Sequence, residues 1–484
     1  MKKYISGIIG ILFGIAALTG CGSNENDTTE VPEVQEEDAL DEYVALGPDV
    51  KLSMLDADFW GTAQDREKDR ELLSLAQISQ INRDNPNLIT TDTGNEFVLT
   101  ELKEEISALV VKELLTADTR PKQPEKRFVD GEPTTEEYWD ALIANNNEEL
   151  ASDKLLVRFG FCVNHSVLKK FPTDDFIGKT AEDLLYDENA RAECPAYAPV
   201  AVLHESLDGE WYYVACCNYA GWIRKENIAL CESKESWLDR QNPEEFLVVT
   251  GRELRLLSEP YQEATSELLL AMGTVLPLVP IEEAPEEFYG RMSYGSYIVC
   301  VPVRTEEGMI DDAFVLVPVS EDVSVGYLPY TQENLKEQLF KWQGDRYGWA
   351  GMYQANDCSG FVREVFACFG FDFPRSAKVQ ITLSGMKHID VAGMTEEEKL
   401  ALLETLPLGS LLYFEGHIMV YLGMSEEIPY VISAVGSWAT PDMQEGESLS
   451  VNSVVINSLT GTTRKDGSSW LKHITEVLVC AEAD

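Results

Sequence analysis

In its last third the chain reads Gly344-Asp-Arg-Tyr-Gly-Trp-Ala-Gly-Met-Tyr-Gln-Ala-Asn-Asp-Cys-Ser-Gly-Phe361. The aromatic and glycine residues at its start are typical of a loop whose backbone approaches a ligand closely. Beyond this loop, four apolar residues recur at helical spacing: Phe361, Val365, Phe366 and Phe369. The spacing predicts a helix that begins near Cys358 and ends at Gly370.

The predicted helix gives Cys358 a position suited to nucleophilic chemistry. A thiol in a first helical turn lies at the positive end of the helix dipole, which favours the thiolate and lowers the pKa. The alternative is a small buried cysteine at a helix start, because free cysteine is among the most buried residue types.

A cysteine nucleophile needs a base, and His417 is the candidate. It begins the second of two strands predicted within residues 411–423, which are joined at Glu415 and Gly416. A histidine at a strand start can face a neighbouring helix N-terminus, although a lone histidine on a strand is more often structural. The other histidines lack a comparable setting: His165, His204, His388 and His473.

Four segments together resemble the NlpC/p60-type papain-like cysteine peptidases, which cut bacterial cell-wall peptides. They occur in the family's order and spacing, at residues 347–351, 357–361, 373–376 and 417–423. The resemblance implies an α+β papain-like fold, with Cys358 as nucleophile and His417 as general base, acting by proton transfer or as an ion pair. It also implies a third polar residue, usually histidine, on the next strand. Here Ser433 occupies that position, and a serine hydroxyl orients an imidazole more weakly.

The same resemblance implies a set of substrate-binding residues: Tyr347, Trp349, Asp357, Ser359, Arg375 and Ser376, with Tyr219 from an upstream domain. Asp357 would pair with a free α-ammonium of the substrate, while a helix N-cap is an equally good and compatible explanation. Arg375 could instead form a surface ion pair. No cofactor and no metal are expected, because the histidines are scattered and no Cys-x-x-Cys occurs.

The N-terminus has the features of an export signal. A basic start precedes an apolar run over residues 5–18, which is too short for a comfortable membrane span and predicts a signal peptide over 1–20. The ending Leu18-Thr-Gly-Cys21 resembles a bacterial lipoprotein signal, which implies a lipidated Cys21 and an extracytoplasmic protein. An uncleaved anchor or an ordinary signal is the alternative. Residues 21–48 predict a disordered acidic tether.

Three further parts precede the catalytic domain, which is expected over 330–484. Residues 49–150 predict a mainly helical stabilising domain, with apolar residues at helical spacing over 71–81 and 102–115 and a capping box at 134–137. Residues 151–233 and 234–329 resemble two small SH3-type β-barrels. In the first, strands over 200–204 and 211–214 flank a turn at 206–209. Barrels without a binding role are the alternative.

Composition limits the partners of this 484-residue chain. The net charge of −46 argues against nucleic acid and against electrostatic binding to anionic lipids. Export permits disulfides, yet the ten cysteines show no tight framework. Adjacent Cys216 and Cys217 should alternate sides of a predicted strand and so should not pair with each other.

The sequence therefore predicts an exported, lipid-anchored cysteine endopeptidase of peptidoglycan stem peptides. In the relatives it resembles, the scissile bond joins γ-D-glutamate to an L-diamino acid, often behind a free N-terminal L-alanine. Two alternatives stay open: an amidase or acyltransferase that uses the same Cys/His pair on another wall bond, and a catalytically decayed wall-binding lipoprotein.

Overall fold

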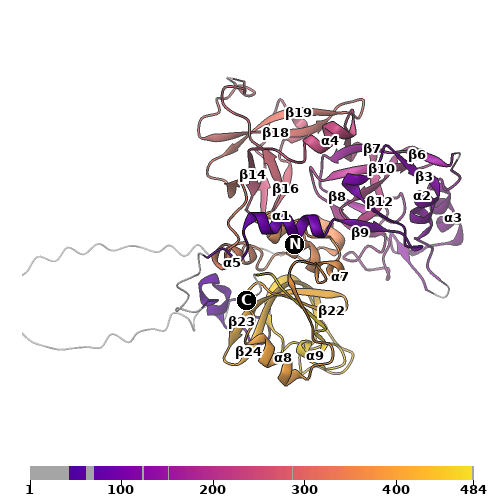
Figure 1. Ribbon diagram of the computed structural model, residues 1–484. Coiled ribbons are helices and arrows are strands. Elements are labelled where there is room, and N and C mark those ends of the chain that lie inside the picture. Colours follow the sequence, from indigo (N-terminus) through magenta and orange to yellow (C-terminus); the bar gives the residue numbers. More distant parts are fainter. Residues whose placement is uncertain (1–42, 62–69, 123–124, 151, 286, 482–484) are drawn as a thin grey trace, which may run out of the picture. The chain divides into compact units, whose positions relative to one another are not determined.

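The computed structural model describes residues 43–61, 70–122, 125–150, 152–285 and 287–481 (Figure 1). The predicted signal peptide, Cys21 and most of the predicted tether lie outside the described residues. Residues from Ala45 onward form one compact unit. The predicted tether boundary at 48 is slightly too late, because the Ser458 N–H donates to the Pro48 carbonyl at 3.2 Å. Within the described ranges, no helix is long and apolar enough to cross a membrane.

Helices and short strands alternate before the first barrel. The helical elements are η2 (Leu52–Leu55), η3 (Ala57–Phe59), α1 (Leu75–Asp84), η4 (Leu99–Glu101), α2 (Ala108–Thr116) and α3 (Glu136–Asn145). The strands are β1 (Leu88–Thr90), β2 (Glu96–Val98), β3 (Glu105–Ser107), β4 (Phe128–Val129), β5 (Glu132–Pro133) and β6 (Lys154–Leu156). The mainly helical prediction was therefore only partly right. A helix was predicted over 102–115, but residues 105–107 form strand β3, which pairs with β6, and helix α2 begins only at Ala108. The cap of α3 is Thr135 and not Thr134.

A seven-stranded antiparallel sheet follows, in the order β13-β7-β10-β11-β12-β8-β9. Its strands are β7 (Arg158–Cys162), β8 (Ser166–Lys169), β9 (Ala190–Cys194), β10 (Pro199–Glu205), β11 (Trp211–Cys216), β12 (Tyr219–Arg224) and β13 (Ile228–Leu230), with η5 (Lys225–Asn227) before the last. The predicted β10–β11 hairpin is confirmed. Both faces of the sheet are buried, with Trp222 and Tyr213 on one side and Cys194 and Val214 on the other.

Small sheets surround a separate apolar core in the next part of the chain. Its elements are α4 (Lys234–Asp239), β14 (Phe246–Val249), β15 (Glu253–Arg255), η6 (Glu263–Thr265), β16 (Leu269–Ala271), β17 (Val275–Pro277), β18 (Ser296–Arg304), β19 (Ile310–Pro318) and β20 (Val323–Val325). The strands form three sheets, β17-β14-β20, β15-β16 and β18-β19. A second SH3-type barrel stays a prediction for this part.

The C-terminal part joins helices to a six-stranded antiparallel sheet, ordered β21-β26-β22-β23-β24-β25. Its helical elements are α5 (Gln332–Phe340), η7 (Trp349–Gln354), α6 (Cys358–Ala367), α7 (Ala377–Gln380), α8 (Glu396–Leu403) and α9 (Trp470–His473). Its strands are β21 (Lys387–Asp390), β22 (Leu411–Phe414), β23 (His417–Ser425), β24 (Ile428–Trp438), β25 (Leu449–Ser458) and β26 (Glu476–Val479). Helices packed on an antiparallel sheet are the predicted α+β arrangement.

Packing fixes the helix that carries the cysteine against the sheet that carries the histidine. Phe361 and Val365 of α6 are fully buried in one cluster with Ile418 and Val420 of β23. The opposite face of the sheet packs in a second cluster that includes Trp470. Alternation along β23 produces these two faces, because successive side chains of a strand point to opposite sides.

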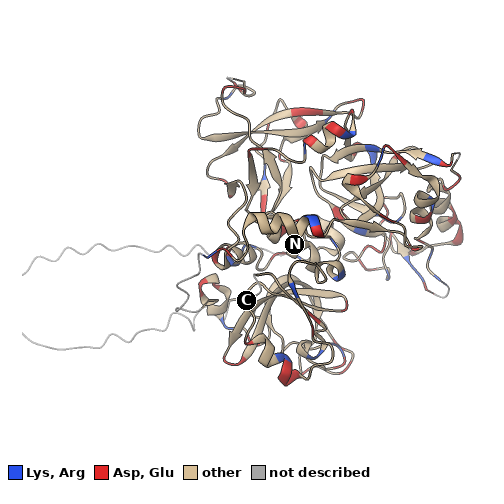
Figure 2. Cartoon of the chain, viewed as in Figure 1, with Lys and Arg blue, Asp and Glu red and all other residues tan. Residues whose placement is uncertain are grey.

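Charged side chains are interspersed along the described chain. Figure 2 shows Asp and Glu on helices, strands and loops alike, with Lys and Arg among them. The acidic excess is therefore spread over the molecule and not confined to one element.

Candidate active site

Cys358 occupies the first position of α6 and is 9% exposed. Asp357 caps the helix, since its Oδ1 accepts a hydrogen bond from the Gly360 N–H at 3.0 Å. The Ile418 N–H, one residue beyond His417, acts on the Cys358 thiol and favours its thiolate. The nucleophile candidate and the start of β23 are therefore brought together as predicted.

The predicted lowering of the Cys358 pKa is wrong. Burial raises the pKa of this thiol to about 12, and the neighbouring Asp357 carboxylate raises it further. The Ile418 and Ser359 N–H groups and the Arg375 charge oppose this rise. The helix-start position alone could not reveal it, because desolvation of a buried thiolate outweighs the effect of the first helical turn.

His417 has the polar partner that the resemblance implied. Its Nε2 lies 3.1 Å from Ser433 Oγ, and Ser433 is fully buried in β24. The rings of Phe414 and Trp470 lie 5.5 and 5.1 Å from the imidazole, centroid to centroid. Burial lowers the pKa of His417 to about 4, although Asp357 acts in the opposite direction. The resting pair is therefore a thiol and a neutral imidazole.

We expect Ser433→Ala to lower kcat/KM by about 2–10-fold, since one neutral hydrogen bond contributes about 0.5–1.5 kcal/mol. The imidazole would keep its aromatic neighbours but lose the hydroxyl that fixes its rotation. Steady-state kinetics measures the loss. Ser453→Ala is the matched control, because Ser453 Oγ donates to the Val451 carbonyl on β25. Equal activity of Ser433→Ala and the parent would exclude an orienting role for Ser433.

The pKa of His417 predicts an unusual pH dependence. We expect kcat/KM to stay high on acidification and to fall only near pH 4, where the imidazole is protonated. Since the folded-state pKa lies below the ordinary value, His417 contributes full stability above about pH 6.5, and this contribution is lost as pH falls from there to about 4. Rate and melting-temperature profiles test both statements against His417→Gln. An acid limb near pH 6.5 would contradict them.

Arg375 is the centre of a buried charge network and not a surface ion pair. The residue is 4% exposed, and its Nη2 and Nη1 donate at 2.7 Å to Asp357 Oδ2 and Ser359 Oγ. The Ser359 hydroxyl in turn donates to Asp357 Oδ1 at 3.1 Å. Burial acts to raise the pKa of Asp357, but Arg375 outweighs it and holds that pKa below its ordinary value. Asp357 is therefore an ionised N-cap beside the nucleophile.

The seven-stranded sheet contributes a carboxylate to this network. Glu193 of β9 is 3% exposed, and its Oε1 lies 3.3 Å from Arg375 Nε and 3.6 Å from Arg363 Nη1. Neither Glu193 oxygen accepts a hydrogen bond from the described residues. Gly351 makes this approach possible, because a Cβ there would lie 2.3 Å from the Glu193 Cβ.

The tip of the β11–β12 hairpin also reaches the site. Asn218 Oδ1 accepts a hydrogen bond from the Arg375 backbone N–H at 2.7 Å. Tyr219, the next residue, is half-buried and close enough for its charge state to affect the pKa of Arg375. The structure therefore brings Tyr219 to the predicted site.

Aromatic side chains form another part of the candidate active site. Burial and the neighbouring Asp357 and Cys358 raise the pKa of Tyr347. The ring of Tyr186, from the first barrel, lies 6.3 Å from Tyr347 and 5.9 Å from Trp349. Trp349 is 37% exposed and its Nε1 donates to the Asp187 carbonyl at 3.2 Å. Ser376 is half-buried at the N-cap of α7, and its side chain makes no capping hydrogen bond.

Sequence reasoning missed three residues of the site, Glu193, Asn218 and Tyr186. All three come from the barrel, more than 100 residues before Cys358. Each resembles an ordinary strand or turn residue in its local sequence. The predicted Tyr219 was the one signal that pointed to this region.

Comparison with known proteins agrees with this geometry. Residues 344–476 match the NlpC/P60 family. The chain carries an NlpC/P60 domain. Members of this family are cysteine peptidases that act on peptidoglycan, and the chain is such an enzyme. Residues 177–224 match an SH3 domain of the SH3b1 type. No curated protein matches the chain.

The solved structures that resemble the chain include two bacterial NlpC/P60 proteins. An NlpC/P60 endopeptidase from Photobacterium damselae subsp. piscicida is 17% identical, with a TM-score of 0.66 over 90% of this chain and 98% of its own. An NlpC/P60 family protein from Bacillus cereus is 16% identical, with a TM-score of 0.44 over 66% of this chain and 98% of its own. The first match shows that the two chains share a fold.

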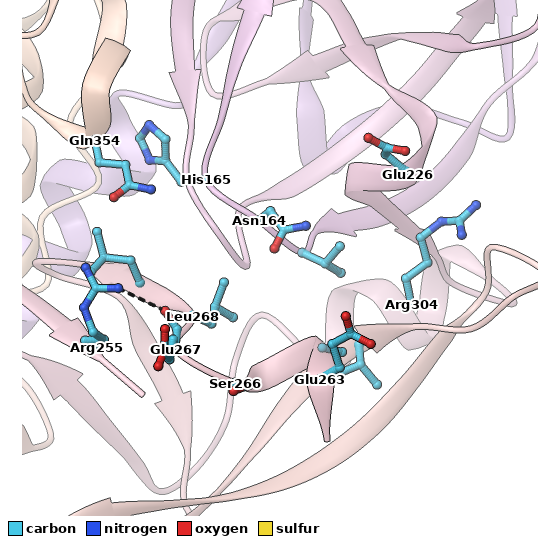
Figure 3. A pocket seen from close by; sticks show the side chains of 14 residues that line it. Asn164, His165, Glu226, Arg255, Glu263, Ser266, Glu267, Leu268, Arg304 and Gln354 are labelled. Carbon is cyan, nitrogen blue, oxygen red and sulfur yellow. Dashed lines mark hydrogen bonds between the residues drawn. The ribbon is translucent and has the colours of Figure 1, made fainter. Parts of the chain in front are cut away.

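A separate pocket of about 500 Å³ borders the active-site loop of the NlpC/P60 domain (Figure 3). Gln354 of that loop and His165, just before β8, lie on one side, and Arg255 lies below them. His165 Nε2 lies 2.9 Å from the Gly351 carbonyl oxygen. The pocket therefore adjoins the loop, and Cys358 is not among the residues that line it. Across the described ranges, no three His, Cys, Asp or Glu side chains are grouped so that they could hold a metal ion.

Proposed function

We propose that the protein hydrolyses the bond between γ-D-glutamate and an L-diamino acid in peptidoglycan stem peptides. The observation that carries the proposal is the junction of the two domains. Barrel residues Glu193 and Tyr219 reach the Asp357 end of the helix that presents Cys358. A short peptide with a charged N-terminus fits such a site better than the middle of a long glycan.

The reaction follows from a neutral thiol–imidazole pair. His417, held through Nε2 by Ser433, takes the Cys358 proton as the thiol attacks the γ-glutamyl carbonyl carbon. N–H groups at the start of α6 have no intrahelical carbonyl to bond and stabilise the tetrahedral oxyanion. The protonated His417 then gives its proton to the leaving amine of the diamino acid. Water, activated by His417, releases the acyl group.

The N-terminal ammonium of a substrate L-alanine would lie against carboxylates. Asp357 is held ionised by Arg375, and the Glu193 oxygens have no hydrogen-bond donor among the described residues. An ammonium group would supply such donors, since it has three N–H bonds. Tyr347 and Trp349 would contact the peptide opposite the barrel, and Ser359 would act through Asp357.

The proposed location is outside the cytoplasmic membrane, with lipid on Cys21. This part of the proposal rests on the sequence ending Leu18-Thr-Gly-Cys21. Labelling cells with a palmitate analogue tests it, because Cys21→Ala should abolish incorporation while the Cys480→Ala control retains it.

Substrate choice is tested with L-alanyl-γ-D-glutamyl-diaminopimelate and its N-acetylated form. We expect kcat/KM to fall at least about 100-fold on acetylation, because an ammonium paired with buried carboxylates contributes about 3 kcal/mol or more. Glu193→Gln should reduce the difference between the two substrates, whereas Glu307→Gln, in an exposed turn, should not. Equal rates for both substrates would exclude amine recognition. Cleavage before L-alanine would favour an amidase.

A further inference from the structure

Four cysteine side chains lie close together in the SH3 domain, and none of the described cysteines is in a disulfide. Cys194 Sγ of β9 lies 3.6 Å from Cys216 Sγ of β11. Cys216 Sγ lies 3.8 Å from Cys217 Sγ. Cys162 Sγ, the fourth, donates to the Asn164 carbonyl at 2.9 Å and to the Cys194 carbonyl at 3.5 Å, and its thiol also acts on the Cys194 thiol.

The predicted separation of Cys216 and Cys217 on opposite sides of a strand is wrong. β11 ends at Cys216, and Cys217 enters the turn with a positive φ of 51°. This turn lets the two thiols lie on the same side. The thiols therefore form a row that begins at half-buried Cys217 and runs inward through Cys216 to fully buried Cys194, with Cys162 beyond it.

The outer end of the row contacts the catalytic helix. Arg363 Nη2 of α6 donates to Cys217 Sγ at 3.2 Å. Hydrogen bonds from Cys194 and Cys217, together with the Arg363 charge, lower the pKa of Cys216. The hydrogen bond with Cys216 and burial raise the pKa of Cys217, and the Arg363 charge opposes this rise. Partial exposure and a cationic neighbour are features of reactive cysteines, and Cys217 has both.

We propose that Cys194 and Cys216 are a site of reversible disulfide formation, with Cys217 as the thiol that meets the oxidant. The oxidant is a small two-electron acceptor of the peroxide class. The Cys217 sulfur attacks one peroxide oxygen beside Arg363 and the O–O bond breaks. A sulfenic acid forms, and the departing hydroxide takes the thiol proton and becomes water. Cys216 then displaces the sulfenic hydroxyl as a second water and forms a transient bond to Cys217.

The last step replaces the disulfide between Cys216 and Cys217 by one between Cys216 and the more deeply buried Cys194. Cys194 loses its proton as it attacks Cys216 Sγ and forms the Cys194–Cys216 disulfide, and Cys217, which leaves beside Arg363, ends with that proton. Two thiols have then lost two hydrogens in total, and one peroxide has become two waters. The geometry suits this order, because each sulfur already lies within 4 Å of the next.

The position of this site matters for the active site. Cys217 precedes Asn218, which holds the Arg375 backbone, and Arg363 lies 3.6 Å from Glu193. The disulfide would fix the tip of the β11–β12 hairpin beside Asn218, which reaches Asp357 through Arg375. The site lies outside the peptidase chemistry, and it needs an oxidising surrounding such as the proposed extracytoplasmic location.

The test uses the full chain with Cys358→Ala, so that the nucleophile does not compete for the oxidant. The reduced protein is treated with hydrogen peroxide, free thiols are alkylated at timed intervals, and a protease that cuts after Glu205 and Glu210 separates Cys194 from Cys216. We expect a linked peptide pair whose fragmentation places the bond at Cys216. Dithiothreitol should restore all three thiols.

Variants distinguish the proposed transfer from Cys217 through Cys216 to Cys194 from general oxidation of the cysteines. Cys217→Ser should slow formation of the linked pair at least tenfold, Cys216→Ser should abolish it, and Cys231→Ser, a buried cysteine outside the row, should leave the rate unchanged. If Cys217→Ser does not fold, the timed alkylation of the parent protein still tests the proposed order. Cys217 must lose its free thiol before Cys194 does. Oxidation of Cys217 to sulfinic acid without a linked pair, or a linked pair that forms equally fast without Cys217, would overturn the proposal.

Discussion

Replacement of His417 by Gln should lower kcat/KM by about 10²–10⁴-fold, the usual contribution of a general base. A glutamine amide can keep the hydrogen bond to Ser433 Oγ but cannot take the Cys358 proton. The loss should be large because burial raises the pKa of Cys358 to about 12, so the free thiol is protonated at neutral pH and depends on the imidazole. Initial rates on a stem tripeptide measure it.

The matched control is His473→Gln. His473 Nε2 lies 2.5 Å from Ser468 Oγ in the loop around α9, so it has the same kind of partner as His417. We expect this variant to keep its rate within about twofold. A His417→Gln enzyme with near-parent activity would show that another group takes the proton.

Arg375→Ala should lower the free energy of unfolding by about 3–5 kcal/mol, because removal of one partner from a buried ion pair leaves an uncompensated charge. Asp357 and Glu193 would both lose their guanidinium partner. The Asp357 pKa should rise, and the N-cap that positions Cys358 should weaken. Urea unfolding measures the change, and activity should fall with it.

Arg240→Ala is the control for this substitution. Arg240 also forms a two-pronged pair, with Asp312 at 2.5 and 2.9 Å, but it is at the surface. We expect a loss of at most about 1 kcal/mol there. Arg375→Lys should lie between the two, since it keeps the charge without the fork geometry. Equal losses in the free energy of unfolding for Arg375→Ala and Arg240→Ala would mean that the buried network adds nothing to stability.

Much of the catalytic domain was predictable from local patterns. The helix after Asp357, the strands on both sides of Gly416 and the position of Ser433 on the next strand are all confirmed. The helix and the strands depend on spacing within a dozen residues, which sequence periodicity records directly, whereas the position of Ser433 was implied by the family resemblance.

What could not be predicted depends on contacts between distant segments. The barrel places Glu193 against Gly351 and Asn218 against Arg375, and no local pattern in the barrel strands indicates this. The prediction of a lowered Cys358 pKa was wrong for a related reason. The helix position is a local property, whereas burial beside Asp357 and β23 arises only after the whole domain has packed.

The most direct measurement is the identity of the product released from L-alanyl-γ-D-glutamyl-diaminopimelate by the parent protein and by Cys358→Ala. Mass spectrometry of both reactions should show L-alanyl-D-glutamate and free diaminopimelate with the parent alone. Cys368→Ala, which removes a buried thiol farther along the same helix region, should still release both products. No product from the parent, or the same products from Cys358→Ala, would contradict the assignment of Cys358 as the nucleophile of a γ-D-glutamyl peptidase.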